Sequence, residues 1–311
     1  MGSPLAPDLV LRRRALSQGW SDDELDRRLR SGELTRIRPG VYQRPGPPQD
    51  AEERHRALVA ATVATLRRPA VVSHQSAAAL HGFPLWRVPL DRVHVTREPP
   101  ASTGAARFVR CHVSRLPDDD VTVLDGIAVT SPLRTALDLA RTVPFESAVV
   151  TLDAALFRRG LAQDVLRDAA ARLGRLPGAR AAFRAARFAD RRSESVGESR
   201  SRVLFSHLGL MPSSLQFRVR TAGGLFVARS DFAWEDADLV GEFDGKVKYG
   251  RFLKPGQDPG EAVFLEKQRE DAVRDTDRGV VRWIWPEITP RILGPRVQRA
   301  LERGRRRRTI A

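Results

Sequence analysis

The 311-residue chain is poor in several residue types, and each shortage excludes a class of protein. Its one cysteine, Cys111, excludes an internal disulfide and a zinc cluster built from cysteine ligands. No apolar run approaches the ~20 residues that a membrane-spanning helix needs, and the N-terminus lacks the apolar core of a signal peptide. These absences predict a cytoplasmic protein without a membrane partner.

Lysine is scarce as well, although the chain is strongly basic. Lys and Arg number 53 against 38 Asp and Glu, a net charge of +15, yet only four of the 53 are lysine. An excess of this size indicates a polyanionic partner, most simply nucleic acid. All four lysines lie between Lys246 and Lys267. Because lysine is a compact charge whose pKa shifts readily, this clustering favours a local chemical role, with drift in an arginine-biased chain as the alternative.

The segment that precedes the lysines has the pattern of a β-hairpin. Two apolar, β-prone runs at residues 225–234 and 239–245 flank an acidic turn at residues 235–238. The simplest antiparallel register pairs Trp234 with Leu239 across that turn. The two runs therefore predict adjacent strands of one sheet.

That register would bring three carboxylates together on one face of the hairpin. Asp231 then lies opposite Glu242, and strand alternation puts Asp244 on the same face as Glu242. Like charges that face each other destabilise a sheet, so the arrangement favours a hard divalent cation between them, which prefers oxygen ligands.

The residues around these acids follow a recognisable order. They are Asp231, then Glu242-x-Asp244-Gly245-x-x-Lys248-Tyr249, then Glu266-Lys267-x-Arg269-Glu270-Asp271. Over residues 193–286 this pattern resembles the PD-(D/E)xK nuclease superfamily, and within it the small domain similar to very-short-patch-repair endonucleases. Asp244 departs from the superfamily's usual order, in which a lysine often follows the second acid. The resemblance implies a restriction-endonuclease-like domain of αβββαβ order.

The same resemblance implies roles for individual residues. Asp231 and Glu242 would hold Mg²⁺ or Mn²⁺ together with Glu198. Asp244 would complete the catalytic set. Lys248, with Lys246 or Lys267 as the alternatives, would place positive charge at the phosphate. Glu198 has a second interpretation, because a serine three residues before it makes a capping box in which glutamate only satisfies a backbone N–H.

The first 45 residues have the outline of a winged helix. Residues 9–16 predict a short helix, residues 21–29 a second helix with a capping box, and residues 34–42 a hairpin. Arginines on the second helix and the hairpin would face DNA, although a solvated basic surface explains them equally well. These arginines are Arg27, Arg28, Arg30, Arg36, Arg38 and Arg44.

Residues 51–160 predict an α/β domain, in which helical spacing alternates with short strands at 93–96 and 108–113. His74 and His81 lie seven residues apart on one predicted helix face and could suggest a metal site. The pattern places no carboxylate or third histidine to complete such a site, so packing or capping is the favoured interpretation.

Three short motifs give this half of the chain a resemblance of its own. They are Gly40-Val41-Tyr42, Ser73-His74-x-Ser76-Ala77-Ala78-x-Leu80-His81-Gly82 and Arg134-Thr135-Ala136-x-Asp138-Leu139. Over residues 8–160 they resemble the AbiEi-type antitoxin family, which joins a winged helix to an α/β domain and acts as a DNA-binding autorepressor in toxin–antitoxin systems. The resemblance implies DNA binding and leaves open whether a toxin partner exists.

Together these patterns predict an α/β multidomain protein in five parts. The parts are a winged-helix domain at 1–45, an AbiEi-like α/β domain at 51–160, a basic helical connector at 161–192, a nuclease-like domain at 193–290 and a basic C-terminal tail at 291–311. The expected function is DNA binding with metal-dependent endonuclease cleavage, in a phage-defence or toxin–antitoxin context. The alternative is a non-enzymatic transcriptional regulator, or antitoxin, whose nuclease-like domain is inactive and only binds.

Overall fold

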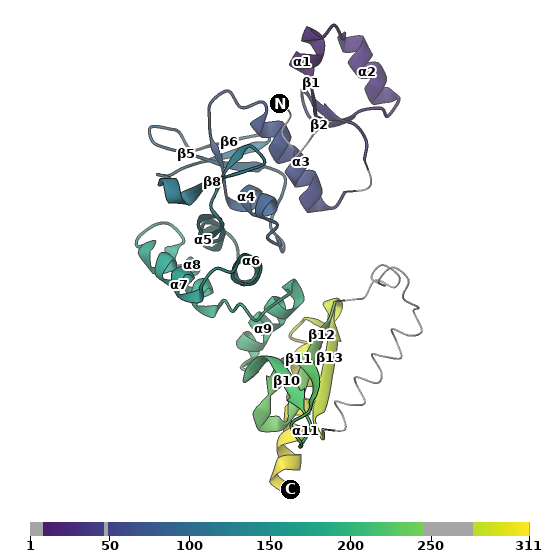
Figure 1. Cartoon of the computed structure of the whole chain (residues 1–311), viewed down its shortest axis with the longest axis vertical. Coiled ribbons are helices and arrows are strands. Elements are labelled where there is room, and N and C mark those ends of the chain that lie inside the picture. The colour runs from purple at the N-terminus through teal and green to yellow at the C-terminus, as the bar shows by residue number, and fades with distance from the viewer. Residues whose placement is uncertain (1–8, 47–48, 246–275, 311) are drawn as a thin grey trace. The chain divides into compact units, whose positions relative to one another are not determined.

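The structure, a computed structural model, describes residues 9–46, 49–245 and 276–310 (Figure 1). The chain forms two compact units, of which unit 1 comprises residues 1–155 and 159–188, and unit 2 comprises residues 156–158 and 189–311. Each unit contains helices and at least one sheet, so the predicted α/β multidomain class is confirmed. No helix within the described ranges combines the length and the apolar content needed to cross a bilayer.

Unit 1 begins with two short helices and a small antiparallel sheet of order β1-β3-β2. These elements are β1 (Leu9–Leu11), α1 (Arg12–Ser17), α2 (Asp22–Arg30), β2 (Thr35–Arg38) and β3 (Val41–Gln43). Ser21 Oγ accepts the Glu24 N–H at 3.1 Å and caps α2 as predicted. The helix predicted from Leu9 is wrong in its first turn. Its residues pair with β3 instead, which gives their backbone groups partners that a first helical turn lacks.

The larger sheet of unit 1 has six strands in the order β6-β7-β5-β4-β9-β8. Its elements are α3 (Ala51–Val63), β4 (Val71–Val72), α4 (His74–His81), β5 (Val93–Arg97), β6 (Gly104–Ala106), β7 (Val109–Val113), β8 (Val121–Leu124), β9 (Ile127–Thr130), α5 (Pro132–Thr142) and α6 (Phe145–Arg159). The two predicted strands are confirmed as β5 and β7. Val95 and Val129 pack with Val59 of α3 in the buried core. Because strand residues alternate between faces, His94 lies on the face opposite Val95.

Two further helices, α7 (Gln163–Arg172) and α8 (Ala179–Phe188), follow α6. Helix α8 contacts both α5 and α7, and Ala182, Ala185 and Ala186 on it are fully buried. The structure thus places both helices inside unit 1, where the sequence predicts a separate basic connector. Small alanine side chains on the buried face allow this close packing despite the many arginines on the exposed face.

Unit 2 is built on a four-stranded sheet whose strand order follows the sequence. Its elements are α9 (Val196–Leu208), β10 (Ser214–Arg220), β11 (Phe226–Trp234), β12 (Leu239–Asp244) and β13 (Gly279–Ile284). The first three strands are antiparallel, whereas β13 runs parallel to β12. This arrangement matches the predicted helix, three strands and final strand. The second helix of the predicted αβββαβ order is expected between β12 and β13, where residues 246–275 lie outside the described residues.

Aromatic side chains form the centre of the core of unit 2. Phe205 of α9 meets Phe232, Trp234 and Trp283 edge to face, with ring centroids 5.6, 5.3 and 5.5 Å apart. Trp283 is 1% exposed and donates its indole N–H to Ser201 Oγ at 2.8 Å. Trp283 therefore belongs to the core of unit 2.

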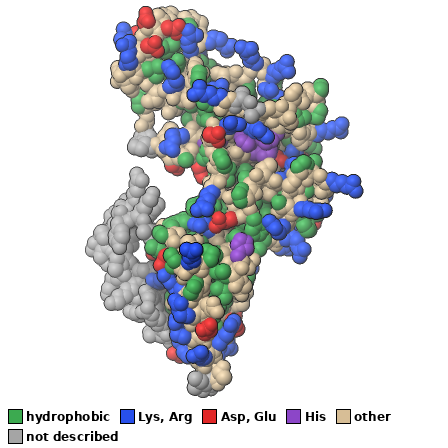
Figure 2. All heavy atoms as spheres, turned by 180° about the vertical axis from the view of Figure 1, so that it is seen from behind, with side chains coloured by type: hydrophobic (Ala, Val, Ile, Leu, Met, Phe, Trp, Pro, Cys, Tyr) green, Lys and Arg blue, Asp and Glu red, His purple; other side chains and the backbone are tan. Residues whose placement is uncertain are grey.

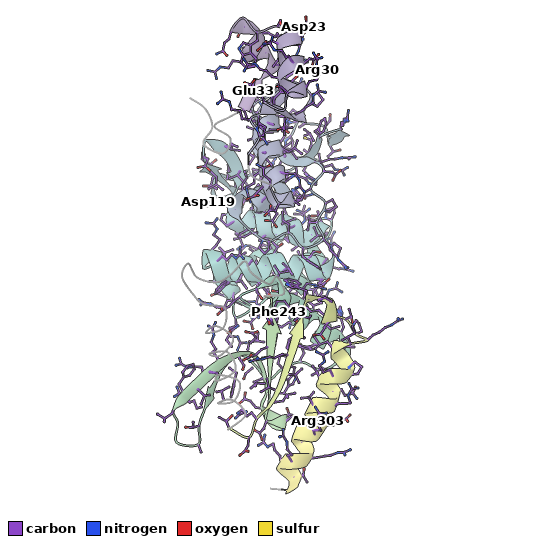
Figure 3. The ribbon with its side chains drawn as sticks, turned by 90° about the vertical axis from the view of Figure 1, so that its right-hand side faces the viewer. Asp23, Arg30, Glu33, Asp119, Phe243 and Arg303 are labelled. Carbon is purple, nitrogen blue, oxygen red and sulfur yellow. The ribbon has the colours of Figure 1, made fainter. Side chains whose placement is uncertain are left out.

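The segment predicted as a basic C-terminal tail is instead helix α11 (Leu293–Ile310). Leu293, Val297 and Leu301 are buried in the core of unit 2, and Arg303 lies on the exposed side of the helix (Figure 3). The prediction is wrong because the arginine run obscures apolar residues that recur at helical spacing.

Candidate functional site

An acidic cluster, consisting of Glu198, Asp231 and Glu242, lies where α9 meets the sheet of unit 2. The predicted hairpin register is confirmed, because Trp234 pairs with Leu239. The pairing continues to Phe232 and Gly241 and stops one residue short of the Asp231–Glu242 pair. Asp231 Oδ2 instead accepts the Phe243 N–H at 2.8 Å.

The other two acids of the cluster are held by neighbouring side chains. Glu242 accepts hydrogen bonds from Ser230 Oγ at 3.2 Å and from Arg282 Nε at 3.0 Å. Glu198 is 8% exposed, and its Oε2 accepts the Glu194 N–H at 3.0 Å. The N–H that Glu198 accepts belongs to the residue before the N-cap Ser195, so the capping box is not formed as predicted, and Glu198 also lies near enough to Asp231 to affect its charge.

Burial and the neighbouring acids change the pKa of carboxyl groups in the cluster. Burial raises the pKa of Asp231 to about 7, and repulsion from the Glu198 and Glu242 carboxylates adds to that rise. Burial also raises the pKa of Glu198. A carboxyl group that is buried among other acids and titrates near neutrality is typical of functional sites.

Gln216 on β10 is a member of this site that the sequence did not indicate. The strand pairs Leu215–Phe232 and Phe217–Ser230 flank it and place it beside Asp231. Its backbone has a φ of 53°, which is strained for a residue other than glycine. Its Nε2 donates to Glu198 Oε2 at 2.9 Å, while its buried Oε1 has no hydrogen-bond partner among the described residues.

The cluster has the carboxylate oxygens that Mg²⁺ prefers as ligands. These oxygens are not close enough together to share one ion without moving. Within the part of the chain that the structure describes, no three carboxylates each offer an oxygen within 4.8 Å of the other two. Asp244 is exposed at the end of β12. Lys248 lies outside the described residues. The acids fit a hard cation by type, and the orphaned Gln216 oxygen adds a fourth candidate donor.

Four of the candidate DNA-contacting arginines are exposed on the N-terminal part of unit 1. Arg27 pairs with Glu24, yet 71% of its side chain is accessible. Arg30, Arg36 and Arg44 are exposed as well, and Figure 3 shows Arg30 at the surface. Arg30 also donates to Asp26 O at 3.3 Å, and Arg36 lies over the Tyr42 ring at 5.8 Å. These contacts lie at the surface and leave the side chains accessible to a phosphate backbone.

The other two arginines are engaged by the protein itself. Arg28 donates to Glu24 and Glu33, both at 2.6 Å. Arg38 is half-buried, donates to Thr62 Oγ1 at 2.8 Å and lies over the Phe108 ring at 5.3 Å. Using either side chain for DNA would therefore require an existing contact to break.

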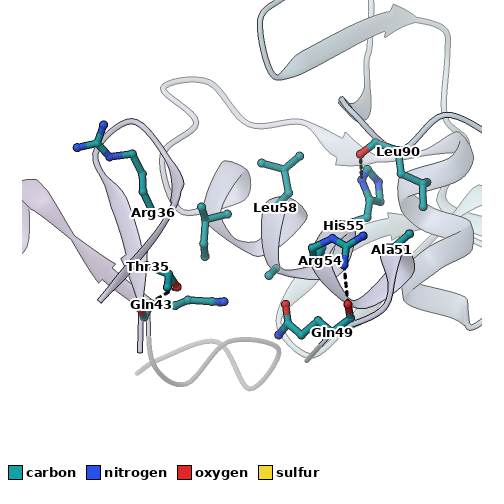
Figure 4. Close-up of a pocket in the computed structure, with 11 residues that line it drawn as sticks. Thr35, Arg36, Gln43, Gln49, Ala51, Arg54, His55, Leu58 and Leu90 are labelled. Atoms are coloured by element: carbon teal, nitrogen blue, oxygen red, sulfur yellow. Dashed lines mark hydrogen bonds between the residues drawn. The ribbon is translucent and has the colours of Figure 1, made fainter. Parts of the chain in front are cut away.

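A pocket of about 470 Å³ lies next to the exposed arginines, between the strands β2 and β3 and helix α3 (Figure 4). Arg36 and Arg54 line it, and His55 Nδ1 hydrogen-bonds to Leu90 O at 2.9 Å. Burial lowers the pKa of His55, so the two guanidinium groups supply the positive charge of the pocket. That charge fits a phosphate-bearing ligand.

The contrast between Arg36 and Arg38 yields a salt-dependence prediction. Arg36→Ala should flatten the log–log dependence of duplex-DNA affinity on salt by about 0.9, the slope expected for one lost phosphate contact. Arg38→Ala should leave that slope unchanged and lower thermal stability, because it removes the contact with Thr62. Fluorescence anisotropy at several salt concentrations measures both slopes. Equal slopes for wild type and Arg36→Ala would remove Arg36 from the interface.

The two histidines singled out in the sequence have separate environments. His81 Nε2 lies 2.8 Å from Thr130 O, so its packing role is confirmed. The expectation that His74 has no histidine partners is wrong, because His94 and His112 lie beside it. The three come from different elements, so no periodicity reveals them. The available signal is that four of the chain's six histidines fall between positions 74 and 112.

Known proteins resemble the chain over most of its length. Residues 70–190 match the model of the AbiEi antitoxin C-terminal domain. The proteins MT2308 and Rv2248, from two strains of Mycobacterium tuberculosis, are each 30% identical over 226 residues, which is 71% of this chain and 77% of each relative. The crystal structure of the RV2827C protein from Mycobacterium tuberculosis covers 69% of this chain and 79% of its own, with 16% identity and a TM-score of 0.37. The family model confirms the AbiEi resemblance for residues 70–160 and extends it to residue 190, just after α8, whereas the predicted winged helix at residues 1–45 lies outside the match.

Proposed function

The chain belongs to the same family as the two mycobacterial proteins and carries an AbiEi antitoxin C-terminal domain, and we propose that it is a DNA-binding protein whose unit 2 hydrolyses phosphodiester bonds. The net charge of +15 and the exposed arginines of unit 1 support nucleic-acid binding. The helices and small sheet at the N-terminus have the order of a winged helix, which supports double-stranded DNA as the partner.

The acidic cluster is the observation that carries the hydrolytic part of the proposal. A domain that only bound DNA would be weakened by buried acids facing the phosphates, since like charges repel. Three carboxylates have been brought together in unit 2 nevertheless, and their repulsion helps to raise the pKa of Asp231 to about 7. The helix and strand order of unit 2 supports a restriction-endonuclease-like domain.

Each residue of the acidic cluster and its neighbours would have a distinct role in hydrolysis. Glu198, Asp231 and Glu242 would hold Mg²⁺ or Mn²⁺, and Arg282 would orient Glu242 through their 3.0 Å contact. The bound ion would supply Lewis-acid activation of the phosphodiester and of water. Lys248 would add positive charge at the phosphate, a role that lies outside the described residues.

A cleavage assay tests this proposal directly. The full chain with Mg²⁺ should cut at least one member of a panel of single-stranded, duplex and mismatched DNA and RNA. Asp231→Asn should lower the rate by about a hundredfold or more, since it removes a group that acts on the reacting phosphate. Asp236→Asn is the matched control, because Asp236 lies on the same hairpin and pairs with Arg305 on the surface. Undiminished cleavage by Asp231→Asn would place the chemistry elsewhere.

A non-enzymatic regulator is the second candidate, and one observation favours it. Glu242 is already paired with Arg282, and in the described structure the three carboxylates of the acidic cluster do not offer oxygens that all lie within 4.8 Å of one another. In that case unit 2 would bind nucleic acid or a partner protein, and the AbiEi domain would act in repression or toxin neutralisation. DNA binding that persists without Mg²⁺, together with no cleavage of any substrate, would establish this second function.

A further inference from the structure

Three histidines from separate elements of unit 1 converge, and two of them lie on the face of its larger sheet opposite Val95 and Cys111. His74 is the first residue of α4, His94 lies on β5 and His112 lies on β7. One ring nitrogen of each lies within 4.8 Å of a ring nitrogen of the other two. His74 is buried, whereas His94 and His112 are partly exposed. Figure 2 shows histidine side chains together at the surface of unit 1, so an ion can reach the group from solvent.

One pair of ring nitrogens, now at hydrogen-bond distance, is spaced nearly as in a metal site. His94 Nδ1 and His112 Nε2 are 3.0 Å apart. Two imidazole nitrogens that share a tetrahedral Zn²⁺ lie about 3.3 Å apart, given Zn–N bonds of about 2.0–2.1 Å. The His74 and His112 rings are stacked, with centroids 3.7 Å apart and an angle of 14° between their planes. A bound metal lies near the plane of each ligand ring, so binding would tilt these two rings out of their stack.

The backbone and neighbouring side chains position the three rings. His74 has a φ of 52°, a conformation that costs energy for a residue other than glycine and is often found at ligand sites. Its Nδ1 lies 3.0 Å from Ser73 Oγ, which leaves Nε2 for a metal. The Gln75 amide contacts the His94 ring at Nε2, at 2.8 Å. Ser76 Oγ accepts the backbone N–H of His94, also at 2.8 Å. Such supporting contacts fix ligand histidines in known metal sites.

Two arginines lie near the group, but a neighbouring carboxylate offsets their charge. Arg134 and Arg141 are both paired with Asp138, which reduces their repulsion of a cation.

We propose that His74, His94 and His112 form a three-histidine site for a divalent transition metal of the zinc class. Imidazole nitrogens favour Zn²⁺, Co²⁺, Ni²⁺ and Cu²⁺ over Mg²⁺, which prefers oxygen. Three protein ligands leave a fourth position for water or another small ligand. The metal would join the start of α4 to β5 and β7, three segments that are separate in sequence. This site is independent of the acidic cluster in unit 2.

Metal titration of the full chain tests the site. After dialysis against a chelator, the wild-type protein should bind one equivalent of Zn²⁺ by calorimetry. One equivalent of Co²⁺ should give the intense visible absorption of a tetrahedral complex, and Zn²⁺ should abolish it. The control is His207→Gln, which changes an exposed histidine at the end of α9 and should leave both signals unchanged. Failure of the wild-type protein to bind either metal would overturn the proposal.

Two further variants separate ligation from folding. His112→Gln changes a partly exposed ring and should weaken Zn²⁺ binding more than the roughly 10–100-fold loss typical of supporting residues. Gln75→Ala keeps all three ligands and should weaken binding by that roughly 10–100-fold amount. Far-UV circular dichroism confirms that both variants are folded. Unchanged affinity in a folded His112→Gln protein would show that the metal binds elsewhere and would overturn the assignment.

Discussion

Asp231→Asn should make the metal-free protein more stable than wild type at about pH 8, while the two proteins should be equally stable near pH 3. Asp231 has a pKa of about 7 in the folded protein against an ordinary value of 3.8. Between these values the folded state holds a proton that the unfolded state has lost, so the stability of wild type falls as the pH rises through this window. The asparagine variant carries no charge there and does not lose that stability.

The size of the effect follows from the width of the window. Three pKa units correspond to about 4 kcal/mol, which is the upper limit for the stabilisation of unit 2 at high pH. Asparagine keeps an oxygen that can accept the Phe243 N–H, so the hydrogen bond at 2.8 Å need not be lost. Hydrogen exchange of the β11 and β12 amides in EDTA, measured at pH 5 and pH 8, reports the stability of this sheet directly.

Magnesium gives the same substitution an opposite effect. Binding of Mg²⁺ to the acidic cluster should protect the wild-type sheet from exchange, by about 2.7 kcal/mol when the free ion is at 100 times its dissociation constant. Asp231→Asn should abolish that protection, whereas the surface variant Asp236→Asn should retain it. If Asp231→Asn instead lowered the stability of the metal-free protein and Mg²⁺ protected neither, Asp231 would be a structural carboxylate.

The second large effect is expected at Asp138, on α5. Its side chain is 1% exposed and accepts hydrogen bonds from Arg134 Nε at 2.9 Å and from Arg141 Nη1 at 3.2 Å. Asp138→Ala should destabilise unit 1 by about 3–5 kcal/mol, because it leaves two largely buried guanidinium groups without their shared partner. Burial raises the pKa of Asp138 despite these arginines, so the loss reflects the stranded positive charges more than a strongly favourable ion pair.

Urea denaturation followed by circular dichroism measures this loss. Asp119→Ala is the control, because Asp119 is exposed before β8 (Figure 3) and should change stability by less than about 0.5 kcal/mol. A cost below about 1 kcal/mol for Asp138→Ala would show that Arg134 and Arg141 find other partners. Asp120, which also contacts Arg134 at 2.9 Å, is the first such partner to examine.

Local patterns in the sequence correctly predict those features whose contacts join residues close together in the chain. The register of Trp234 with Leu239 follows from the turn between them, and the cap of α2 follows from Ser21 and Glu24. The failures involve pairing between distant segments. Arg282 meets Glu242 only because β13 lies parallel to β12, 40 residues away in sequence, and no short motif encodes that pairing.

Contacts between distant segments also explain why the sequence does not predict the histidine group or the place of Gln216 beside the acidic cluster. His74, His94 and His112 come together through the order of strands β5 and β7, which hydrophobic alternation does not specify. Gln216 reaches Glu198 through a strained backbone that propensities do not foresee. Helix α11 is a different case. Its apolar residues recur at helical spacing in the sequence, but the run of arginines makes the segment resemble a basic tail.

Helix α11 also constrains the timing of folding during synthesis. The ribosome makes the chain from the N-terminus, and domains generally fold as they emerge. Every strand of unit 2 is made before Leu293, Val297 and Leu301, yet these three side chains are part of its buried core. Gly304 then lies so close to the Ala237 carbonyl that a methyl group in its place would clash. The newly made strands of unit 2 therefore keep part of their apolar surface uncovered until α11 has been synthesised. Unit 1 is free to fold before that point.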